Sequence, residues 1–305
     1  MKINRVAVLL STFNGVKYID EFLTSLVNQS FKHFDLFVRD DASVDETISV
    51  VNSYSDRLNI HIFRSRENLG PAMSFMNLLV NSGSEFDYYF FADQDDCWYE
   101  NKIELALSKL VGRDEQPSLY FSALELVDSK LNHLSFSVHP KFIGFDNALV
   151  QNVAIGCTMA FNSKARSVVL KSLPKVMVMH DWWFYIVISA FGAVLYDKQP
   201  SLKYRQHSGN VVGAATNIYQ DFNRRVNRFF SRKKVGVFCI GEQVAEFYRC
   251  YHKLLSTAQI ELVQGLLNGK KSVSSRIQLV FNPGLHRQKF VDNFILRILF
   301  LIGKY

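Results

Sequence analysis

The sequence has few cysteines, and it lacks the spacings that bind zinc or build a disulfide framework. Four cysteines are scattered over 305 residues without a CxxC pair, which predicts reduced thiols in a cytoplasmic protein. The patterns GxGxxG and GxxxxGK[ST] are also absent, which argues against a dinucleotide site and a P-loop ATP site. The apolar run near the N-terminus covers only residues 6–10, so no signal peptide is expected.

Long hydrophobic runs are missing as well. The most apolar stretch, residues 294–302, is interrupted by Arg297, and a helix needs about twenty apolar residues to cross a bilayer. An apolar fraction of 48%, with 26 phenylalanines, is nevertheless ample for a packed core. We expect a globular protein with one large domain and a smaller appendage.

Charge is distributed unevenly along the chain. Residues 1–217 carry 20 basic and 23 acidic side chains, whereas residues 218–305 carry 15 basic and 5 acidic ones. Basic and apolar residues alternate near the start of the second part at spacings close to one helical turn, which predicts a basic amphipathic helix. These residues are Phe222, Arg224, Arg225, Val226, Arg228, Phe229, Phe230, Arg232, Lys233 and Lys234. Two interpretations stay open: a region that lies on an anionic membrane surface, or an ordinary helical subdomain with a solvated basic face.

Apolar strands alternate with helical patterns through the first two hundred residues. Strands are expected at 6–10, 34–39, 60–63, 88–92 and 194–196, and helices at 16–28, 45–54, 71–80 and 101–110. This order predicts an α/β fold with a mostly parallel sheet covered by helices on both faces. Ligands of such sheets bind beyond the carboxyl ends of the strands.

Three carboxylates follow one of these expected strands directly. Asp93, Asp95 and Asp96 come after an aromatic run that reads as a buried strand. Clustered carboxylates repel one another unless a cation is bound or water surrounds them. A divalent cation with diphosphate oxygens in its shell would satisfy the cluster, and a solvated acidic turn is the alternative.

Polar residues also follow the other expected strands. Thr12 and Asn14 could bind a base or ribose, although a simple turn explains them too. Asp40 could accept the imide N–H of a pyrimidine, or the Asp-Asp-Ala-Ser segment could cap the next helix. Asn68 lies in a loop that enters a helix. We expect these strand ends to converge on one crevice.

Taken together, the segments STFNG, VRDDAS, NLGPAMSFMN and FFADQDD with a following tryptophan resemble the family 2 glycosyltransferases with the GT-A fold. The resemblance runs over residues 5–215. It implies a nucleotide-sugar-binding half at 1–96 and an acceptor-binding half at 97–217, followed by a basic helical extension at 218–305. It also implies that the donor sugar nucleotide would contact Thr12, Asn14, Asp40, Asn68, Asp93 and Gln94. Asp95 would bind Mg²⁺ or Mn²⁺, with Asp96 close behind.

The second half offers an acidic residue among aromatics, in the segment Met179-His180-Asp181-Trp182-Trp183. Transfer with inversion needs a base for the acceptor hydroxyl and a cation for the departing diphosphate. The resemblance makes Asp181 that base, whereas without it a helix N-cap explains the residue. The role of His180 is open. Trp182 or Trp183 could stack on a sugar, although a helical tryptophan often belongs to the core.

A further polar segment, YRQHSGNVVG at 204–213, together with HDWW resembles the rhamnosyltransferase-like subgroup that builds bacterial surface polysaccharides. Arg205 would pair with a diphosphate oxygen, and His207 would bind the metal or a phosphate, although a lone histidine is often structural. In this subgroup the segment 151–158 shapes the acceptor side, which points to Asn152 and Gly156.

These features predict an inverting, metal-dependent glycosyltransferase. TDP-rhamnose is the leading donor, and UDP-galactose or a UDP-hexosamine is the alternative. The expected acceptor is a glycan or a polyprenyl-diphosphate-linked glycan of O-antigen or capsule synthesis, at the cytoplasmic face of the inner membrane. A silent nucleotide-sugar-binding scaffold and a nucleic-acid-binding protein are the other classes. We expect no nucleic-acid partner, because the aromatic residues of the basic region lie at helical spacing with aliphatic ones.

Overall fold

A computed structural model describes residues 4–206 and 240–305. In these residues nine strands form one mixed sheet with the order β3-β2-β1-β4-β8-β6-β9-β5, and β7 pairs with β6 at the side. The strands are β1 (Val6–Thr12), β2 (Phe34–Asp40), β3 (Asn59–Arg64), β4 (Tyr88–Asp93), β5 (Cys97–Trp98), β6 (Ser118–Val127), β7 (His133–Phe136), β8 (Ala160–Asn162) and β9 (Ala193–Arg205). The α/β fold with a mixed sheet agrees with the sequence prediction.

The first four strands are parallel; β1, β2 and β4 are buried, whereas β3 at the edge of the sheet is partly exposed. β1 pairs with β2 and with β4, and β2 pairs with β3, all in parallel. Their near-continuous apolar residues suit a sheet with helices on both sides. The intervening helices are α1 (Ile19–Val27), α2 (Thr47–Asn52) and α3 (Gly70–Asn81), and every expected element of this half ends within three residues of its predicted bounds.

The chain direction in the sheet reverses beyond β4. β8 is antiparallel to both β4 and β6, and β6 is parallel to the long β9. The carboxyl ends of β1, β2 and β4 therefore share one edge with the start of β8 and with the 3₁₀ turn η1 (Gly156–Thr158) that precedes it. Residues from both halves of the chain meet at that edge.

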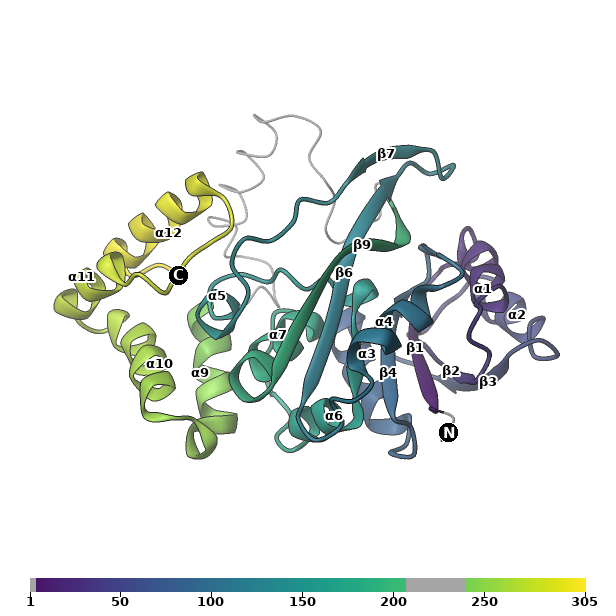
Figure 1. Ribbon diagram of the computed structural model, residues 1–305, viewed down its shortest axis with the longest axis horizontal. Coiled ribbons are helices and arrows are strands. Elements are labelled where there is room, and N and C mark those ends of the chain that lie inside the picture. Colours follow the sequence, from purple (N-terminus) through teal and green to yellow (C-terminus); the bar gives the residue numbers. More distant parts are fainter. Residues whose placement is uncertain (1–3, 207–239) are drawn as a thin grey trace.

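Two hydrophobic clusters cover the two faces of the sheet (Figure 1). Alternate residues of β1 divide between them: Ala7 and Leu9 join one cluster, and Val6, Val8 and Leu10 join the other, as the two-residue period of a strand requires. On one face lie α1, α2 and α4 (Lys102–Leu110); on the other lie α3, α6 (Ser163–Leu170) and α7 (His180–Phe191). The short α5 (Phe145–Ala148) packs against α7.

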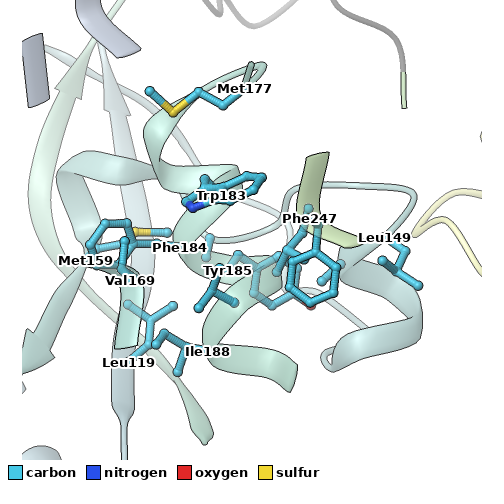
Figure 2. Close-up of a cluster of buried hydrophobic side chains, with 14 of the residues drawn as sticks. Leu119, Leu149, Met159, Val169, Met177, Trp183, Phe184, Tyr185, Ile188 and Phe247 are labelled. Carbon is cyan, nitrogen blue, oxygen red and sulfur yellow. The ribbon is translucent and has the colours of Figure 1, made fainter. Parts of the chain in front are cut away.

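Four further helices follow at one end of the molecule, opposite α1 and α2 (Figure 1). They are α9 (Ile240–Tyr251), α10 (Thr257–Gly269), α11 (Val273–Phe281) and α12 (Phe290–Ile302), with the 3₁₀ turn η2 (His252–Leu254) after α9. The buried face of α9 joins the core of the main domain: Phe247 lies against Trp183 of α7, and Val244 and Tyr251 are buried in the same cluster (Figure 2). The predicted boundary at residue 217 therefore does not separate two cores.

The basic helix expected at 222–234 lies outside the described residues. No helix within the described ranges has both the length and the apolar character needed to span a bilayer.

Candidate active site

The ends of β1, β2 and β4 are joined by side-chain hydrogen bonds. Thr12 Oγ1 donates to Asp40 Oδ1 at 3.2 Å. The Gln94 amide accepts from Phe13 N at 3.0 Å and donates to Phe13 O at 2.9 Å. The predicted convergence of these strand ends is thus confirmed, and Thr12, Asp40 and Gln94 lie together.

Asn14 and Gly15 give the loop after β1 its shape. Asn14 has a φ of 46°, a region that asparagine tolerates better than most residues. Its Oδ1 accepts from Val44 N at 2.9 Å, and its backbone N–H donates to Ser43 Oγ. A Cβ on Gly15 would collide with the Gln94 amide. The turn interpretation therefore holds for this loop.

Asp40 does not cap the following helix. It is 3% exposed, and its Oδ2 accepts from Ser43 N at 3.2 Å. The neighbouring Asp41, which the sequence analysis did not single out, forms a buried ion pair with Arg39 and accepts from the backbone N–H groups of Leu69 and Gly70.

Asn68 takes part in the same loop between β3 and α3. Its Oδ1 accepts from Gly70 N at 2.9 Å, and Gly70 has a φ of +74°. Glycine adopts this left-handed conformation readily, so Gly70 in the sequence was the available signal for a tight turn at this point.

The carboxylate cluster begins at the last residue of β4. Asp93 and Asp95 are partly exposed, whereas Asp96 is fully buried. No described N–H or O–H group donates to its carboxylate oxygens, and the Cys157 thiol lies beside them. Ligand atoms of Asp93, Asp96 and Cys157 lie within 4.8 Å of one another. Buried carboxylate oxygens without a donor are costly, so a cation would relieve the cluster.

Burial and mutual repulsion both hold protons on this cluster. Desolvation, followed by repulsion from Asp95 and Asp181, raises the pKa of Asp93 to about 7. Desolvation and repulsion from Asp95 and Asp93 raise the pKa of Asp96 well above its usual range. The two halves of the chain meet here, because Gly156 N donates to Asp181 Oδ2 and the adjacent Cys157 lies beside Asp93 and Asp96.

Lys102 supplies a positive charge beneath the carboxylates. Its Nζ is buried, donates to Cys157 O at 2.9 Å and to Ser201 Oγ at 3.1 Å, and lies 4.7 Å from the centre of the Trp98 ring. Desolvation lowers its pKa to about 8, and Asp96 and Asp93 oppose that shift. The sequence analysis missed this residue, because a lysine on an amphipathic helix normally faces water.

The donor set suits a hard divalent cation. Carboxylate oxygens of Asp93 and Asp96 lie together and are ligands that Mg²⁺ and Mn²⁺ accept, whereas Asp95, the predicted metal ligand, is not part of that group. Desolvation raises the pKa of the Cys157 thiol well above its usual range, which keeps the sulfur protonated and makes it a poor ligand.

Asp181 lies at the first turn of α7, facing the same edge of the sheet. Its Oδ2 accepts from Gly156 N at 3.1 Å, and its Oδ1 accepts from Trp182 N at 2.6 Å. Desolvation raises its pKa to about 6, against hydrogen bonds from Trp182, Gly156 and Asn152 that lower it. A carboxylate with a pKa near 6 is mostly ionised at neutral pH and is suited to accept a proton there.

His180 and Gly156 support the position of Asp181. The His180 ring stacks on Phe75, with 4.0 Å between centroids, and meets Phe91 edge to face at 4.8 Å. Desolvation lowers its pKa to about 3, so the ring is neutral and serves in packing. A Cβ on Gly156 would lie 2.9 Å from His180 Nε2, which explains why a glycine stands there.

The two tryptophans differ in what they can contact. Trp183 is fully buried, and its ring contacts Phe247 (Figure 2) and Tyr251. The side chain lies on the inward face of α7, so the prediction that it binds the acceptor is wrong. Trp182 is partly buried, and its Nε1 donates to Ala148 O at 2.7 Å, which leaves a part of its ring accessible.

Arg205 occupies a structural position. Its side chain is fully buried, its Nε donates to Asp95 O at 2.9 Å, its Nη1 donates to Ser129 O at 2.7 Å, and it pairs with Glu21. This contradicts the predicted contact with a diphosphate oxygen, since the guanidinium holds the loop of Asp95 in place. His207 lies outside the described residues.

Comparisons with known proteins agree with the observed fold. The sequence model of glycosyl transferase family 2 matches residues 7–167. The dTDP-rhamnosyl transferase RfbG of Shigella flexneri is 27% identical over 235 residues, which cover 70% of this chain and 77% of that protein. The putative teichuronic acid biosynthesis glycosyltransferase TuaG of Bacillus subtilis is 25% identical and covers 62% and 74%. Among solved structures, residues 1–349 of TarS of S. aureus in complex with UDP-GlcNAc align with a TM-score of 0.58 at 17% identity, over 99% of this chain and 93% of that chain.

Proposed function

The chain belongs to glycosyl transferase family 2, and on that premise we propose that it transfers a sugar with inversion from a nucleoside-diphosphate sugar to a glycan hydroxyl. The observation that carries the mechanism is geometric: Gly156 N donates to Asp181 Oδ2, and the sulfur of the next residue, Cys157, lies within 4.8 Å of carboxylate oxygens of Asp93 and Asp96. A base and a cation site are then neighbours, as a direct displacement at an anomeric carbon requires.

The nucleotide would lie over the ends of β1, β2 and β4. Thr12 and Asp40 would form the floor of the base pocket, and the loops of Asn14 and Asn68 would border it. The Asp40 carboxylate is able to accept the imide N–H of thymine or uracil and disfavours cytosine, which offers no such donor. Either a TDP or a UDP sugar fits this chemistry.

Asp93, Asp95 and Asp96 would hold the divalent cation, which would offset the charge that develops on the departing diphosphate. The acceptor oxygen forms its bond to the anomeric carbon as the bond from that carbon to the diphosphate breaks. Its proton passes to the Asp181 carboxylate, which Gly156 N and Trp182 N orient. Lys102 lowers the repulsion among the carboxylates from beneath.

Rhamnose is the proposed sugar, supported by the similarity to a protein named as a dTDP-rhamnosyl transferase. UDP-galactose and UDP-hexosamines are the competing donors. The proposed acceptor is a glycan, free or linked to a polyprenyl diphosphate, in the synthesis of a bacterial surface polysaccharide, with the enzyme peripheral on the cytoplasmic face of the membrane. Residues 218–305 are the proposed contact with anionic lipid.

A donor panel tests the proposal. Thermal unfolding of the full chain with Mn²⁺ would be followed in the presence of TDP-rhamnose, UDP-galactose and UDP-GlcNAc. Release of the nucleoside diphosphate would then be measured with the donors that stabilise the protein and with glycan acceptors. We expect Asp181→Asn to lower turnover by about 10²–10⁴-fold while the donor-induced shift persists. Wild-type turnover in this variant would remove Asp181 as the base, and stabilisation without turnover in the wild type would favour a silent scaffold.

A further inference from the structure

The most exposed residues of α12 are all apolar. All six exposed residues of this helix are hydrophobic, and Phe290 is the most exposed at 87%. α11 contributes a second apolar stripe, in which Phe281 is 79% exposed. We call this surface the hairpin face: Val273, Ile277, Phe281, Phe290, Val291, Phe294, Ile298, Leu301 and Ile302.

The inner sides of the same two helices are apolar as well. Leu279 of α11 and Leu296, Leu299 and Phe300 of α12 are buried in the core cluster. Arg297 joins the two helices from within, since its guanidinium donates to Leu279 O at 2.7 Å and to Leu285 O at 2.9 Å. A surface helix of a soluble protein normally keeps a polar outer face, and an apolar patch of this extent marks a docking site.

Positive charge surrounds the hairpin face. Residues 270–305 contain seven lysines and arginines against one acidic residue, Asp292. Lys289 at the start of α12 and Lys304 just after its end are both exposed. Two copies of the chain that met through this surface would bring like charges together, whereas anionic lipid would complement both the charge and the apolar residues.

The loop between α11 and α12 is attached to the acceptor side of the candidate active site. Gln288 Nε2 donates to Phe142 O at 2.6 Å, and Gln288 N donates to Gln151 Oε1 at 2.8 Å. Asn147 Nδ2 donates to His286 O at 2.8 Å. The segment held in this way continues directly into Asn152, whose hydrogen bond lowers the pKa of Asp181.

We propose that the hairpin face inserts into the interfacial region of an anionic bilayer, with its phenylalanines among the acyl chains and Lys289 and Lys304 at the headgroups. The loop that follows α11 then holds the acceptor segment 141–152 beside the membrane surface, where the diphosphate of a lipid-linked acceptor lies. This inference rests on the proposed function for the identity of the acceptor, but the membrane contact itself does not depend on it.

Flotation of the purified full chain with vesicles tests the proposal. Vesicles of phosphatidylglycerol and phosphatidylethanolamine should carry the wild type upward, and vesicles of phosphatidylcholine should carry much less. We expect the triple variant F290S/F294S/I298S to lose about tenfold or more of its vesicle-bound fraction relative to free protein. The matched control is V80S/V111S, which replaces exposed valines on α3 and after α4 and should float like the wild type.

A second variant covers the case in which the triple variant misfolds. K289E/K304E leaves every apolar residue in place and should lose binding to the anionic vesicles selectively. Light scattering after size exclusion would run alongside: a wild-type dimer that the triple variant converts to a monomer identifies a second copy as the occupant and overturns the membrane assignment. Equal flotation of the wild type and both hairpin variants overturns it as well. Turnover with a water-soluble acceptor is unaffected by either result, so a failure here is distinguishable from a failure of the proposed reaction.

Discussion

At Asp181, burial sets the pH at which the carboxylate can accept a proton. Its pKa is raised to about 6 mainly by desolvation, so the group is protonated below that value and ionised above it. A base must be ionised to act. In the proposed mechanism, the location of this residue at the start of α7 would set the lower pH limit of the reaction.

We predict that kcat/KM rises about tenfold per pH unit below pH 6 and levels off above it. Initial rates from pH 5 to pH 8 at saturating Mn²⁺ would show this acidic limb of the pH profile, in which kcat/KM rises with pH. Asp181→Glu, which keeps the carboxylate but moves it, should retain a shifted limb at lower activity. A profile that is flat from pH 5 to pH 7 would contradict the assignment.

The aromatic run before Asp93 singled out the Asp93–Asp96 cluster, and the resemblance to the family 2 glycosyltransferases singled out Asp181 as a base. Sequence patterns could not distinguish Trp182 from Trp183, since that distinction depends on the rotation of α7 against the sheet. Lys102 and Asp41 were missed for a related reason: their partners, Cys157 O and the backbone of Gly70, are far away along the chain. The predicted role of Arg205 was wrong because an arginine can donate to backbone carbonyls as well as to a phosphate, and the sequence does not show which partner is present.

Among the elements, α9 changes the view of the second part of the chain. Charge composition suggested a separable region from residue 218 onward, yet Phe247, Val244 and Tyr251 complete the core that α7 begins. Composition averages over a helix and does not show which residues face inward. Removal of residues 218–305 would therefore expose the main core, and surface substitutions are the better way to study this region.

The packing of α9 gives a direct prediction. Phe247→Ala removes a fully buried ring that contacts Trp183 and Tyr251, and we expect the free energy of unfolding to fall by about 3–5 kcal/mol. Urea denaturation would measure this change. Phe281→Ala, which truncates a ring that is 79% exposed, is the control and should change stability by less than about 0.5 kcal/mol. Equal effects would show that α9 is not part of the core.

For the whole molecule, the reversal of the sheet at β8 is what brings the two halves to one edge. The parallel first half was readable from its alternating strands and helices. The antiparallel β8 was not, because Ala160–Asn162 has only three residues and directly precedes α6. Gly156 lies near Asp93 because β8 pairs in antiparallel register with β4. Local sequence does not encode this long-range pairing.

Binding of a cation at this edge should stabilise the complete fold. With the complex of Mn²⁺ and a nucleoside diphosphate at a hundredfold excess over its Kd, mass action gives a gain of about 2.7 kcal/mol. Thermal unfolding would report a higher Tm, and EDTA should reverse it. Asp95→Ala should show a much smaller shift, and an unchanged shift in that variant would place the cation elsewhere.

The buried contacts of Arg205 have a consequence for how the enzyme is made. This side chain fastens the carbonyl of Asp95, 110 residues earlier, and the carboxylate of Glu21, 184 residues earlier. During translation the nucleotide half leaves the ribosome long before Arg205 does. A nascent chain whose synthesis has not reached β9 therefore lacks the contacts that hold the loop of Asp95, and this part of the candidate active site completes its structure only after Arg205 has been synthesised.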